Sequence, residues 1–441
     1  MPPKLALTLT IIFILFLLRL DRKQYPKASC ALWIPTIWIL LVTSKALGVW
    51  TGTGGSMEEG SPLDRNVLIV LFVISTLILT KRNFHWSNTI RNNLWLMIVI
   101  AYMLISVLWS ETPFISLKRW VRGEGVMIVM ACVVASEVNH QQAVISVFRR
   151  IAYIHMPLSI LLIKYYPPLG VSFGRWTGEV AWHGVSTQKN GLAQLCLFVI
   201  FFFLWTFIRR WRGFDKSVTW YQTYIEIFVV MLAIWLFMGP NHTLTYSSTS
   251  LACLLIGILT LLGLLWLKNK NIILGAYLLT AIISLIIIYA AVTPFIGSLP
   301  LFNVSSLLSR SETLTGRSEI WEKLIPLAMA KPFLGHGFGF WSEELSELLK
   351  TNSGHNGYLD TIFTLGFIGL ILSSIFLVTS CRKAQNKMMH DIDWGSFWFC
   401  MVLMATIHDI AESSLDSLTG LFPMIIFIQI SCQYQKTQKL S

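Results

Sequence analysis

Long uninterrupted apolar runs constrain this chain more than any other feature of its sequence. Runs of about 16 to 24 apolar residues recur along the 441 residues, and only 13% of all residues are charged. A helix of about 20 residues crosses the roughly 30 Å hydrocarbon core of a bilayer. The mean hydropathy of +0.64 excludes an ordinary soluble globular protein, and no ten-residue alternation indicates a membrane β-barrel. We therefore predict an all-α, polytopic integral membrane protein.

The apolar runs predict about 12 to 13 transmembrane helices in a single membrane domain that covers residues 1–441. The first run, Leu5–Leu20, has no small-residue cleavage site, so we expect a retained span and not a cleaved signal peptide. That run is short, and the residues alone leave an even number of spans open. The expected spans lie near residues 5–20, 30–48, 66–80, 93–109, 120–136, 143–164, 190–208, 222–239, 248–267, 271–291, 357–379, 395–410 and 418–432. Seven cysteines lie in or beside these runs without CxxC spacing, which predicts buried thiols and no metal site.

Lysine and arginine cluster in alternate connectors, and this pattern predicts the orientation of the chain. The basic connectors are residues 22–27, 81–91, 209–216, 268–270, 382–387 and 436–439. The positive-inside rule places them in the cytoplasm, so the net charge of +12 is explained without nucleic acid binding. The other side then receives the connectors at 58–64, 111–118, 167–190 and 241–247 and a long loop at about 292–355, and the N-terminus lies outside.

The long loop between the expected tenth and eleventh spans is where a membrane enzyme would carry its chemistry, because long structured loops are often functional. It contains Thr315-Gly316-Arg317, then Pro332–Gly337, then His355-Asn356. Within it, Ile320–Ala330 has helical apolar spacing, which predicts an amphipathic helix on the outer surface of the membrane.

Several cations lie on the side where the positive-inside rule disfavours them, which calls for another explanation. Arg175 and Arg317 carry planar forks of donors that suit phosphate oxygens, and Lys189 adds a compact charge. This set predicts a diphosphate site, and the alternative is a rim of side chains that extend to the lipid headgroups. Lys118, Arg119 and Arg122 share one helix face and either extend this site or anchor the helix at the interface.

His355 is the candidate general base, because its reference pKa of about 6.5 lets it accept a proton from a sugar hydroxyl. The alternative is a histidine that only caps the following helix. Gly357, Gly366 and Gly369 in that helix predict the close approach of another helix. Asp409 and Glu412, near His408, are either partners of the arginines or a structural pair, and the sequence does not separate the two.

Two further motifs carry less weight. Asp391-Ile392-Asp393 has the spacing with which glycosyltransferases hold a metal and a nucleotide sugar, but it falls in a predicted cytoplasmic connector. Gly335–Gly339 is rich in glycine but follows no strand, so it does not predict a nucleotide fold.

Together the motifs resemble the bacterial O-antigen ligase and O-antigen polymerase superfamily. The resemblance runs from about residue 30 to the C-terminus, with the ligase-like region at about 170–375, and Ala31–Pro35 looks like the exopolysaccharide polymerase branch. The motifs that carry it are Trp109-Ser110, Arg175–Gly178 followed by Lys189-Asn190, Thr315-Gly316-Arg317 with Trp321, Pro332–Gly337, and His355-Asn356.

The resemblance implies a metal-independent, inverting glycosyltransferase without a cofactor in the bacterial inner membrane, with an active site that faces the periplasm. Members of the family take a glycan from an undecaprenyl-diphosphate carrier. They pass it to a hydroxyl on lipid A core, on another carrier-linked repeat unit, or on a protein side chain. We expect polymerisation of O-antigen or exopolysaccharide repeat units, with a chain-length regulator as a partner, and ligation to lipid A core is the alternative. An alternative from another class is a membrane transporter of an anionic solute, which predicts charged residues deep within several spans.

Residue by residue, the resemblance assigns diphosphate binding to Arg175 and Arg317, with Lys189 as a helper. It assigns activation or positioning of the acceptor hydroxyl to His355. Between Arg175 and Lys189, Glu179 and His183 stay without a definite role, and His183 joins Arg119 and Arg122 as a candidate for substrate binding.

Overall fold

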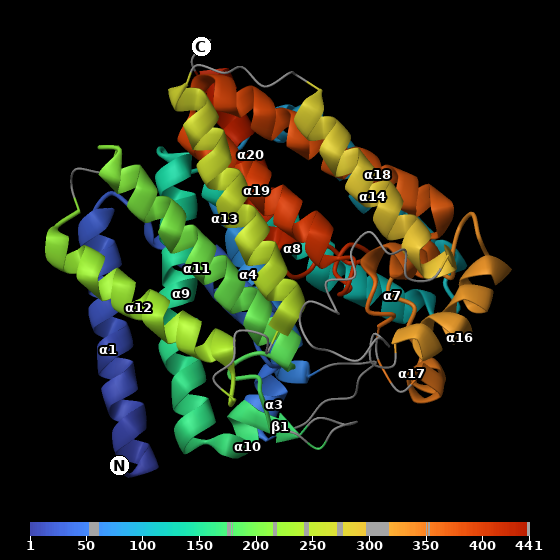
Figure 1. The fold of residues 1–441 in the computed structure, drawn as a ribbon, viewed down its shortest axis with the longest axis horizontal. Coiled ribbons are helices and arrows are strands. Elements are labelled where there is room, and N and C mark those ends of the chain that lie inside the picture. The colour runs from blue at the N-terminus through green and yellow to red at the C-terminus, as the bar shows by residue number, and fades with distance from the viewer. Residues whose placement is uncertain are drawn as a thin grey trace.

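The computed structural model describes residues 1–52, 61–173, 178, 180–214, 218–241, 247–270, 277–296, 317–349, 351 and 353–438. Over these residues the chain is almost entirely helical, with one two-stranded hairpin of β1 (Val171–Phe173) and β2 (Val180–Trp182). Long helices run side by side through the molecule, and the two termini lie at opposite ends of it (Figure 1). The prediction of an all-α polytopic membrane protein is confirmed.

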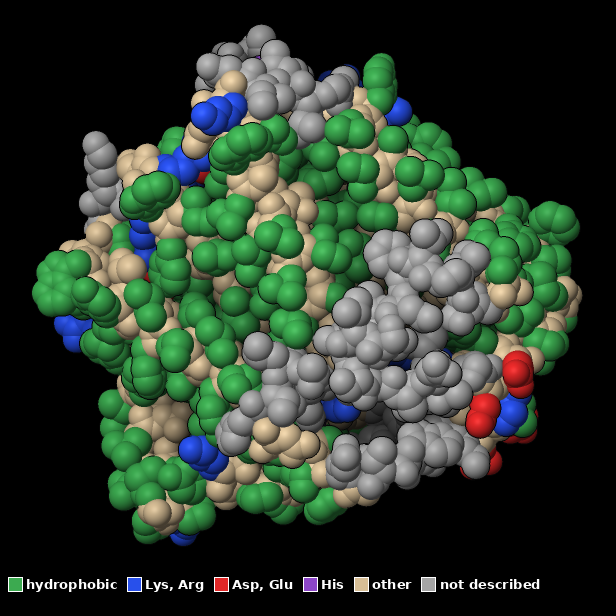
Figure 2. All heavy atoms as spheres, viewed as in Figure 1, with side chains coloured by type: hydrophobic (Ala, Val, Ile, Leu, Met, Phe, Trp, Pro, Cys, Tyr) green, Lys and Arg blue, Asp and Glu red, His purple; other side chains and the backbone are tan. Residues whose placement is uncertain are grey.

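Eight helices of the described chain are long and apolar enough to cross a bilayer on their own. They are α1 (Pro3–Gln24), α4 (Pro62–Lys81), α9 (His140–Tyr165), α11 (Lys189–Trp211), α12 (Trp220–Met238), α13 (Ser248–Asn269), α14 (Leu278–Ile296) and α18 (Gly357–His390). The most buried of them is α9, whereas most residues of α1 and α4 are not buried. Hydrophobic side chains cover much of the molecular face seen in Figure 2.

The other predicted spans fall on helices that are shorter or interrupted, so the sequence-based count of about 12 to 13 exceeds the eight long helices. One of them is sharply bent, because α5 (Trp86–Asn92) makes an angle of 96° with the helix that follows it. Another contains the π-helical turn η3 (Val121–Gly125) between α7 and α8. The remaining elements are η1 (Cys30–Leu32), α2 (Trp33–Val42), α3 (Leu47–Thr51), α6 (Leu94–Ser106), η2 (Val107–Trp109), α7 (Pro113–Trp120), α8 (Val126–Ala135), α10 (Pro167–Gly170), α19 (Ile392–His408) and α20 (Phe422–Gln438).

Contacts between connectors follow the two predicted sides of the membrane. Arg82, in the predicted cytoplasmic connector 81–91, lies 2.8 Å from Glu137 and donates to Ser29, which lies two residues after the predicted cytoplasmic connector 22–27. At the opposite end, Trp109 Nε1 donates to the Leu334 carbonyl at 3.1 Å, and both residues belong to regions predicted to be extracytoplasmic. Each of these contacts joins residues near one predicted side, and the assignment of the two sides stays a prediction.

The absolute orientation can be tested with single cysteines in a variant that lacks the seven native ones. Leu348 is 53% exposed in the long loop, and Met389 is 68% exposed near the basic connector after α18. In whole cells we expect Leu348→Cys to react with a membrane-impermeant maleimide and Met389→Cys to react only after the membrane is broken. The opposite labelling pattern would invert the topology.

The long loop contains two helices in its described part, α16 (Arg317–Ala330) and α17 (Glu343–Leu349). The predicted amphipathic helix is present as α16, and it packs against α18. Trp321, Leu324 and Ala328 on its apolar face are buried. This face is therefore covered by protein, in contrast to the predicted position on the membrane surface.

Segment 332–337 of the long loop docks against an unwound turn of α18, and we call this arrangement the loop joint. Gly366 has φ of 69° and interrupts α18. Backbone bonds between the two segments replace the missing helical ones. They run from His336 N to Phe363 O at 2.9 Å, Gly337 N to Thr364 O at 2.8 Å, Phe367 N to Pro332 O at 2.7 Å and Ile368 N to Phe333 O at 3.3 Å.

Glycines allow this docking, because a Cβ on Gly366 would overlap the Phe333 carbonyl and a Cβ on Gly335 would overlap the backbone of Thr364. The prediction that another helix approaches Gly366 is wrong, since a loop approaches it instead. At Gly369 a helix does approach, because Tyr102 of α6 lies 3.3 Å from the position of a Cβ there.

A buried charge network that the sequence analysis did not anticipate joins four helices near the predicted cytoplasmic side. Asp21 of α1 lies 3.0 Å from Arg149 and 2.7 Å from Arg150 of α9. Glu226 of α12 lies 3.6 Å from Arg149 and also pairs with Arg210 of α11. Because a buried charge without a partner costs several kcal/mol, these pairs fix α1, α11 and α12 around α9.

Candidate active site

His355 lies at the entrance to α18, between two residues that are tightly held. Asn356 caps the helix, and its Oδ1 accepts hydrogen bonds from the backbone N–H groups of Tyr358 at 3.1 Å and Leu359 at 2.9 Å. On the other side, Gly354 N donates to the Asp360 carboxylate at 2.9 and 3.0 Å. His355 itself has φ of 51°, a conformation that non-glycine residues adopt at a cost and that often marks functional sites.

Glu412, in the connector between α19 and α20, is the centre of the candidate site. Its Oε2 lies 3.6 Å from His355 Nδ1, and its Oε1 lies 3.5 Å from Arg317 Nη2 at the start of α16. The side chain of Asn190 in α11 also donates to Oε1. We call His355, Glu412, Arg317 and Asn190 the Glu412 cluster. It joins residues from four regions that are far apart in the sequence.

The connector that carries Glu412 is fixed to the start of α18. Gly357 N lies 2.8 Å from the Asp409 carbonyl and 2.9 Å from the Glu412 carbonyl, and Asn356 Nδ2 donates to Ile410 O at 3.2 Å. The same backbone bonds that cap α18 therefore set the position of the Glu412 carboxylate relative to His355.

The charges around Glu412 keep it ionised. Burial by itself would raise the pKa of the Glu412 carboxyl, but the adjacent His355, His408 and Arg317 outweigh burial and lower the pKa below its ordinary value. The side chains of His355 and Glu412 are 23% and 12% exposed, so the cluster is accessible from one side. A carboxylate beside Nδ1 favours the tautomer with the proton there, which leaves Nε2 able to accept a proton.

Two predicted site residues of the long loop lie close together, and a third lies at the start of α11. Arg317 and His355 both contact Glu412. Lys189 is the first residue of α11 and precedes Asn190, whose side chain reaches the same carboxylate. Arg175 and Glu179 lie outside the described residues, so their placement stays a prediction.

Arg119 and Arg122 lie elsewhere. Arg119 of α7 donates to the Gly339 carbonyl, just after the loop joint, and Arg122 in η3 is exposed. The hydrogen bond from Arg119 to Gly339 fastens α7 to the long loop, which is a structural role. Substrate binding by these two arginines stays a prediction.

His183 forms a separate pair with Lys45, a residue that the sequence analysis did not single out. Its Nδ1 lies 2.8 Å from Lys45 Nζ, and Lys45 also donates to the carbonyls of Leu169 and Gly184. Burial lowers the pKa of Lys45 to about 8. Burial and the Lys45 charge lower the pKa of His183 below its ordinary value. This pair ties the end of α2 to the segment before α11, and a role in substrate binding stays a prediction.

The weaker motifs have structural roles in the described chain. The glycines at 335–339 belong to the loop joint and its continuation, and Asp391 Oδ1 accepts from Trp394 N at 3.1 Å as the N-cap of α19. Among the described residues, no group of three or more His, Cys, Asp or Glu side chains is arranged to hold a metal ion.

Comparison with known proteins agrees with the site. The family profile described as O-antigen ligase matches residues 241–373, which include Arg317, the loop joint and His355. The exopolysaccharide production protein ExoQ of Rhizobium meliloti is 21% identical over 311 residues, which cover 68% of this chain and 66% of that protein. The ComP-specific O-oligosaccharyltransferase of Acinetobacter baylyi is 29% identical over 150 residues, or 31% of this chain and 26% of that protein. The matches thus span less than two thirds of either relative.

The order of the motifs, the meeting of Arg317 and His355 at Glu412, the polytopic helical fold and these matches all point to the same family. Residues 241–373 match the O-antigen ligase family, and the resemblance of this chain to the superfamily of O-antigen ligases and O-antigen polymerases is confirmed.

Proposed function

We propose that this protein is a membrane glycosyltransferase that moves a glycan from an undecaprenyl-diphosphate carrier to an acceptor hydroxyl at the extracytoplasmic face of the bacterial inner membrane. The observation that carries the proposal is the Glu412 cluster, in which one half-buried carboxylate contacts both a histidine and an arginine of the long loop. The family match, and relatives whose names refer to exopolysaccharide production and oligosaccharide transfer, support an enzyme of this general kind.

His355 acts as the general base in this proposal. Glu412 holds the imidazole through Nδ1, so that Nε2 takes the proton from the acceptor hydroxyl as its oxygen attacks the anomeric carbon of the donor. In this structure Nε2 lies 3.3 Å from the Thr351 hydroxyl, which marks the place that an acceptor hydroxyl would take. The 3.6 Å contact between Nδ1 and Glu412 is slightly longer than a hydrogen bond, as is common before substrate binds.

The arginines stabilise the leaving group. As the bond between the anomeric carbon and the diphosphate oxygen breaks, its electron pair stays on the diphosphate, and a fixed guanidinium lowers the energy of that developing charge. Arg317 is held by Glu412 at the start of α16, and Lys189 and Arg175 complete the proposed set. Attack opposite to the leaving group inverts the anomeric configuration. A diphosphate donor needs neither a nucleotide nor a metal in this scheme.

Polymerisation of repeat units is the reaction that we favour, because the relative that matches the larger share of this chain is an exopolysaccharide production protein. Ligation to lipid A core is the second candidate, since the matching family profile is described as O-antigen ligase.

The two reactions differ in their products, so one reconstitution distinguishes them. Purified protein in nanodiscs, supplied only with carrier-linked repeat units, is expected to build a ladder of glycan lengths, and chelator is expected to leave the ladder unchanged. A single transfer to added lipid A core, without elongation, would replace the polymerase assignment by the ligase assignment. No transfer to either acceptor from a competent donor would refute the proposed function.

A further inference from the structure

A cavity of about 150 Å³ lies beside the Glu412 cluster, between the end of α2, the start of α11 and the connector before α20. Roughly ten water-sized groups would fill this volume, which is about the size of one sugar ring with its hydroxyls. None of the twelve residues that line it is charged. They are Val42, Thr43, Ser44, Ser186, Thr187, Gly191, Gln194, Leu195, Phe198, Gly420, Leu421 and Met424.

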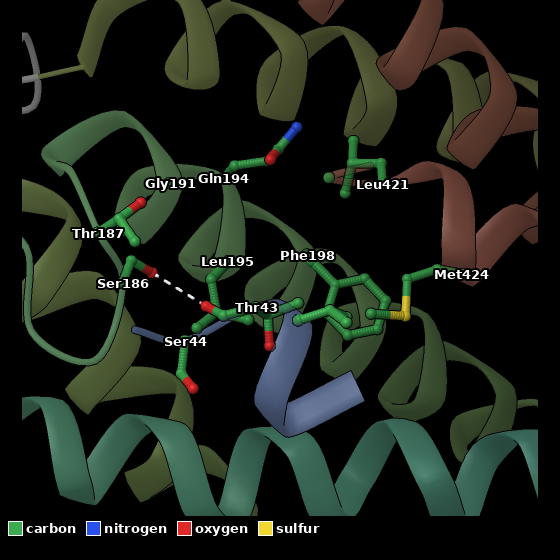
Figure 3. A pocket seen from close by; sticks show the side chains of 12 residues that line it. Thr43, Ser44, Ser186, Thr187, Gly191, Gln194, Leu195, Phe198, Leu421 and Met424 are labelled. Carbon is green, nitrogen blue, oxygen red and sulfur yellow. Dashed lines mark hydrogen bonds between the residues drawn. The ribbon is translucent and has the colours of Figure 1, made fainter. Parts of the chain in front are cut away.

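The lining is divided into a polar and an apolar part. Figure 3 shows Ser186 and Thr187 on one side and Phe198, Leu421 and Met424 on the opposite side. Hydroxyl and amide groups on one wall and apolar side chains on the other match a sugar ring, which carries hydroxyls at its edge and C–H groups on its faces. A purely hydrocarbon ligand would leave the polar wall without hydrogen-bond partners.

Gln194 connects the cavity with the Glu412 cluster. It follows Asn190 by four residues, so the two side chains share a face of α11 and lie about 6 Å apart along the helix axis. Asn190 donates to Glu412, and Gln194 Nε2 lies 3.3 Å from His408 Nδ1. The His408 carbonyl in turn accepts from Glu412 N at 3.1 Å. The cavity is therefore one helical turn away from the proposed chemistry.

The connector between α19 and α20 makes a second link, because it supplies Glu412 at one end and the cavity wall at the other. Gly420 has φ of 64° and lies directly against Gln194, since a Cβ there would be 2.7 Å from the Gln194 amide nitrogen. Within the part of the chain that the structure describes, the Gln194 amide makes one hydrogen bond, to His408, and the Thr187 hydroxyl makes none. Both residues line the cavity, so the Gln194 amide and the Thr187 hydroxyl can form further hydrogen bonds with a ligand there.

We propose that this cavity binds the uncharged sugar that carries the acceptor hydroxyl, with Gln194 and Thr187 as its hydrogen-bonding groups. This inference rests on the proposed glycan transfer. The first sugar of the donor is joined to the diphosphate and must stay beside the cations. The acceptor sugar is the end of a repeat unit farthest from its own diphosphate, so it suits a neutral cavity.

Occupancy of the cavity can be measured without turnover. In a variant that lacks the native cysteines, Thr187→Cys places a thiol in the wall, and its reaction with a maleimide reports whether the cavity is filled. The probes are methyl glycosides of neutral hexoses and, separately, undecaprenyl phosphate without sugar. Thr51→Cys is the matched control, because Thr51 is exposed on the same predicted side but does not line the cavity. Ser44→Cys provides a second reporter if Thr187→Cys does not fold.

We expect at least one glycoside to slow labelling of Thr187→Cys but not of Thr51→Cys, and undecaprenyl phosphate to leave both rates unchanged. Adding Gln194→Leu, which removes one hydrogen bond, should weaken this protection roughly two- to tenfold. Adding Arg317→Ala should leave the protection intact, because Arg317 does not line the cavity. Protection therefore tests the sugar site independently of the proposed glycan transfer. Protection by undecaprenyl phosphate alone would assign the cavity to a lipid, and the absence of protection by every glycoside would refute the sugar site.

Discussion

We expect His355→Ala to slow glycan transfer by about a hundred-fold or more, which is the effect of losing a general base. Binding of the carrier-linked donor should persist, because Arg317 and Lys189 remain in place. The measurement is the initial rate of transfer by purified protein, together with donor binding measured separately. A histidine that only stabilised the entrance of α18 would instead lower folded yield and donor binding together.

Glu412 provides the sharper version of this test, because its proposed effect acts largely through His355. Glu412→Gln keeps the shape of the side chain but removes the charge beside Nδ1, so the rate should fall strongly. In the His355→Ala background the same change should cost much less, since residues that work as a unit are not additive. Glu111→Gln is the matched control, because Glu111 is an exposed carboxylate paired with Lys331 in the same predicted compartment. If the losses of transfer rate from the two substitutions were instead additive, His355 and Glu412 would act independently.

Arg317→Ala should reduce transfer by roughly a hundred- to a thousandfold, as expected when a preformed donor to a developing negative charge is removed. Arg317→Lys should recover part of the rate only, because an ammonium group lacks the planar fork of the guanidinium. Donor binding should weaken in both variants, which distinguishes them from His355→Ala.

The control for Arg317 is Arg65→Ala, which removes an exposed arginine at the predicted extracytoplasmic end of α4. Its rate should match that of the unaltered protein. If Arg317→Ala is inserted in the membrane at a normal level and transfers glycan at the rate of the unaltered protein, Arg317 is not part of the active site.

The sequence predicted the fold and part of the site, because both depend on signals that a single chain carries. Apolar runs and alternating basic connectors are direct consequences of bilayer thickness and topology. Arg317 and His355 stand out because they are polar groups in one long loop, and the structure brings both to Glu412. Glu412 was left between a functional and a structural role, because the partners of its carboxylate group at His355, Arg317 and Asn190 are 57 or more positions away in the sequence.

Other features depended on tertiary contacts that periodicity does not report. The glycine at 366 indicated a close approach, but a helix and a loop leave the same signal in the sequence. The long loop suggested a helix at the bilayer surface, whereas the apolar face of α16 is covered by α18. Asp21 and Arg149 lie within or beside apolar runs, and their pairing across 128 positions was not visible from either run.

The loop joint has a consequence for how this protein can be divided or recombined. Four backbone hydrogen bonds of α18 are made only when segment 332–337 is in place, and a backbone group left without a partner at membrane depth costs several kcal/mol. The loop therefore cannot be exchanged between relatives as an independent specificity module, because its removal would also break a membrane helix. The region matched by the family profile, residues 241–373, contains both halves of this joint. Chimeras should accordingly keep 332–337 and 363–368 from the same parent.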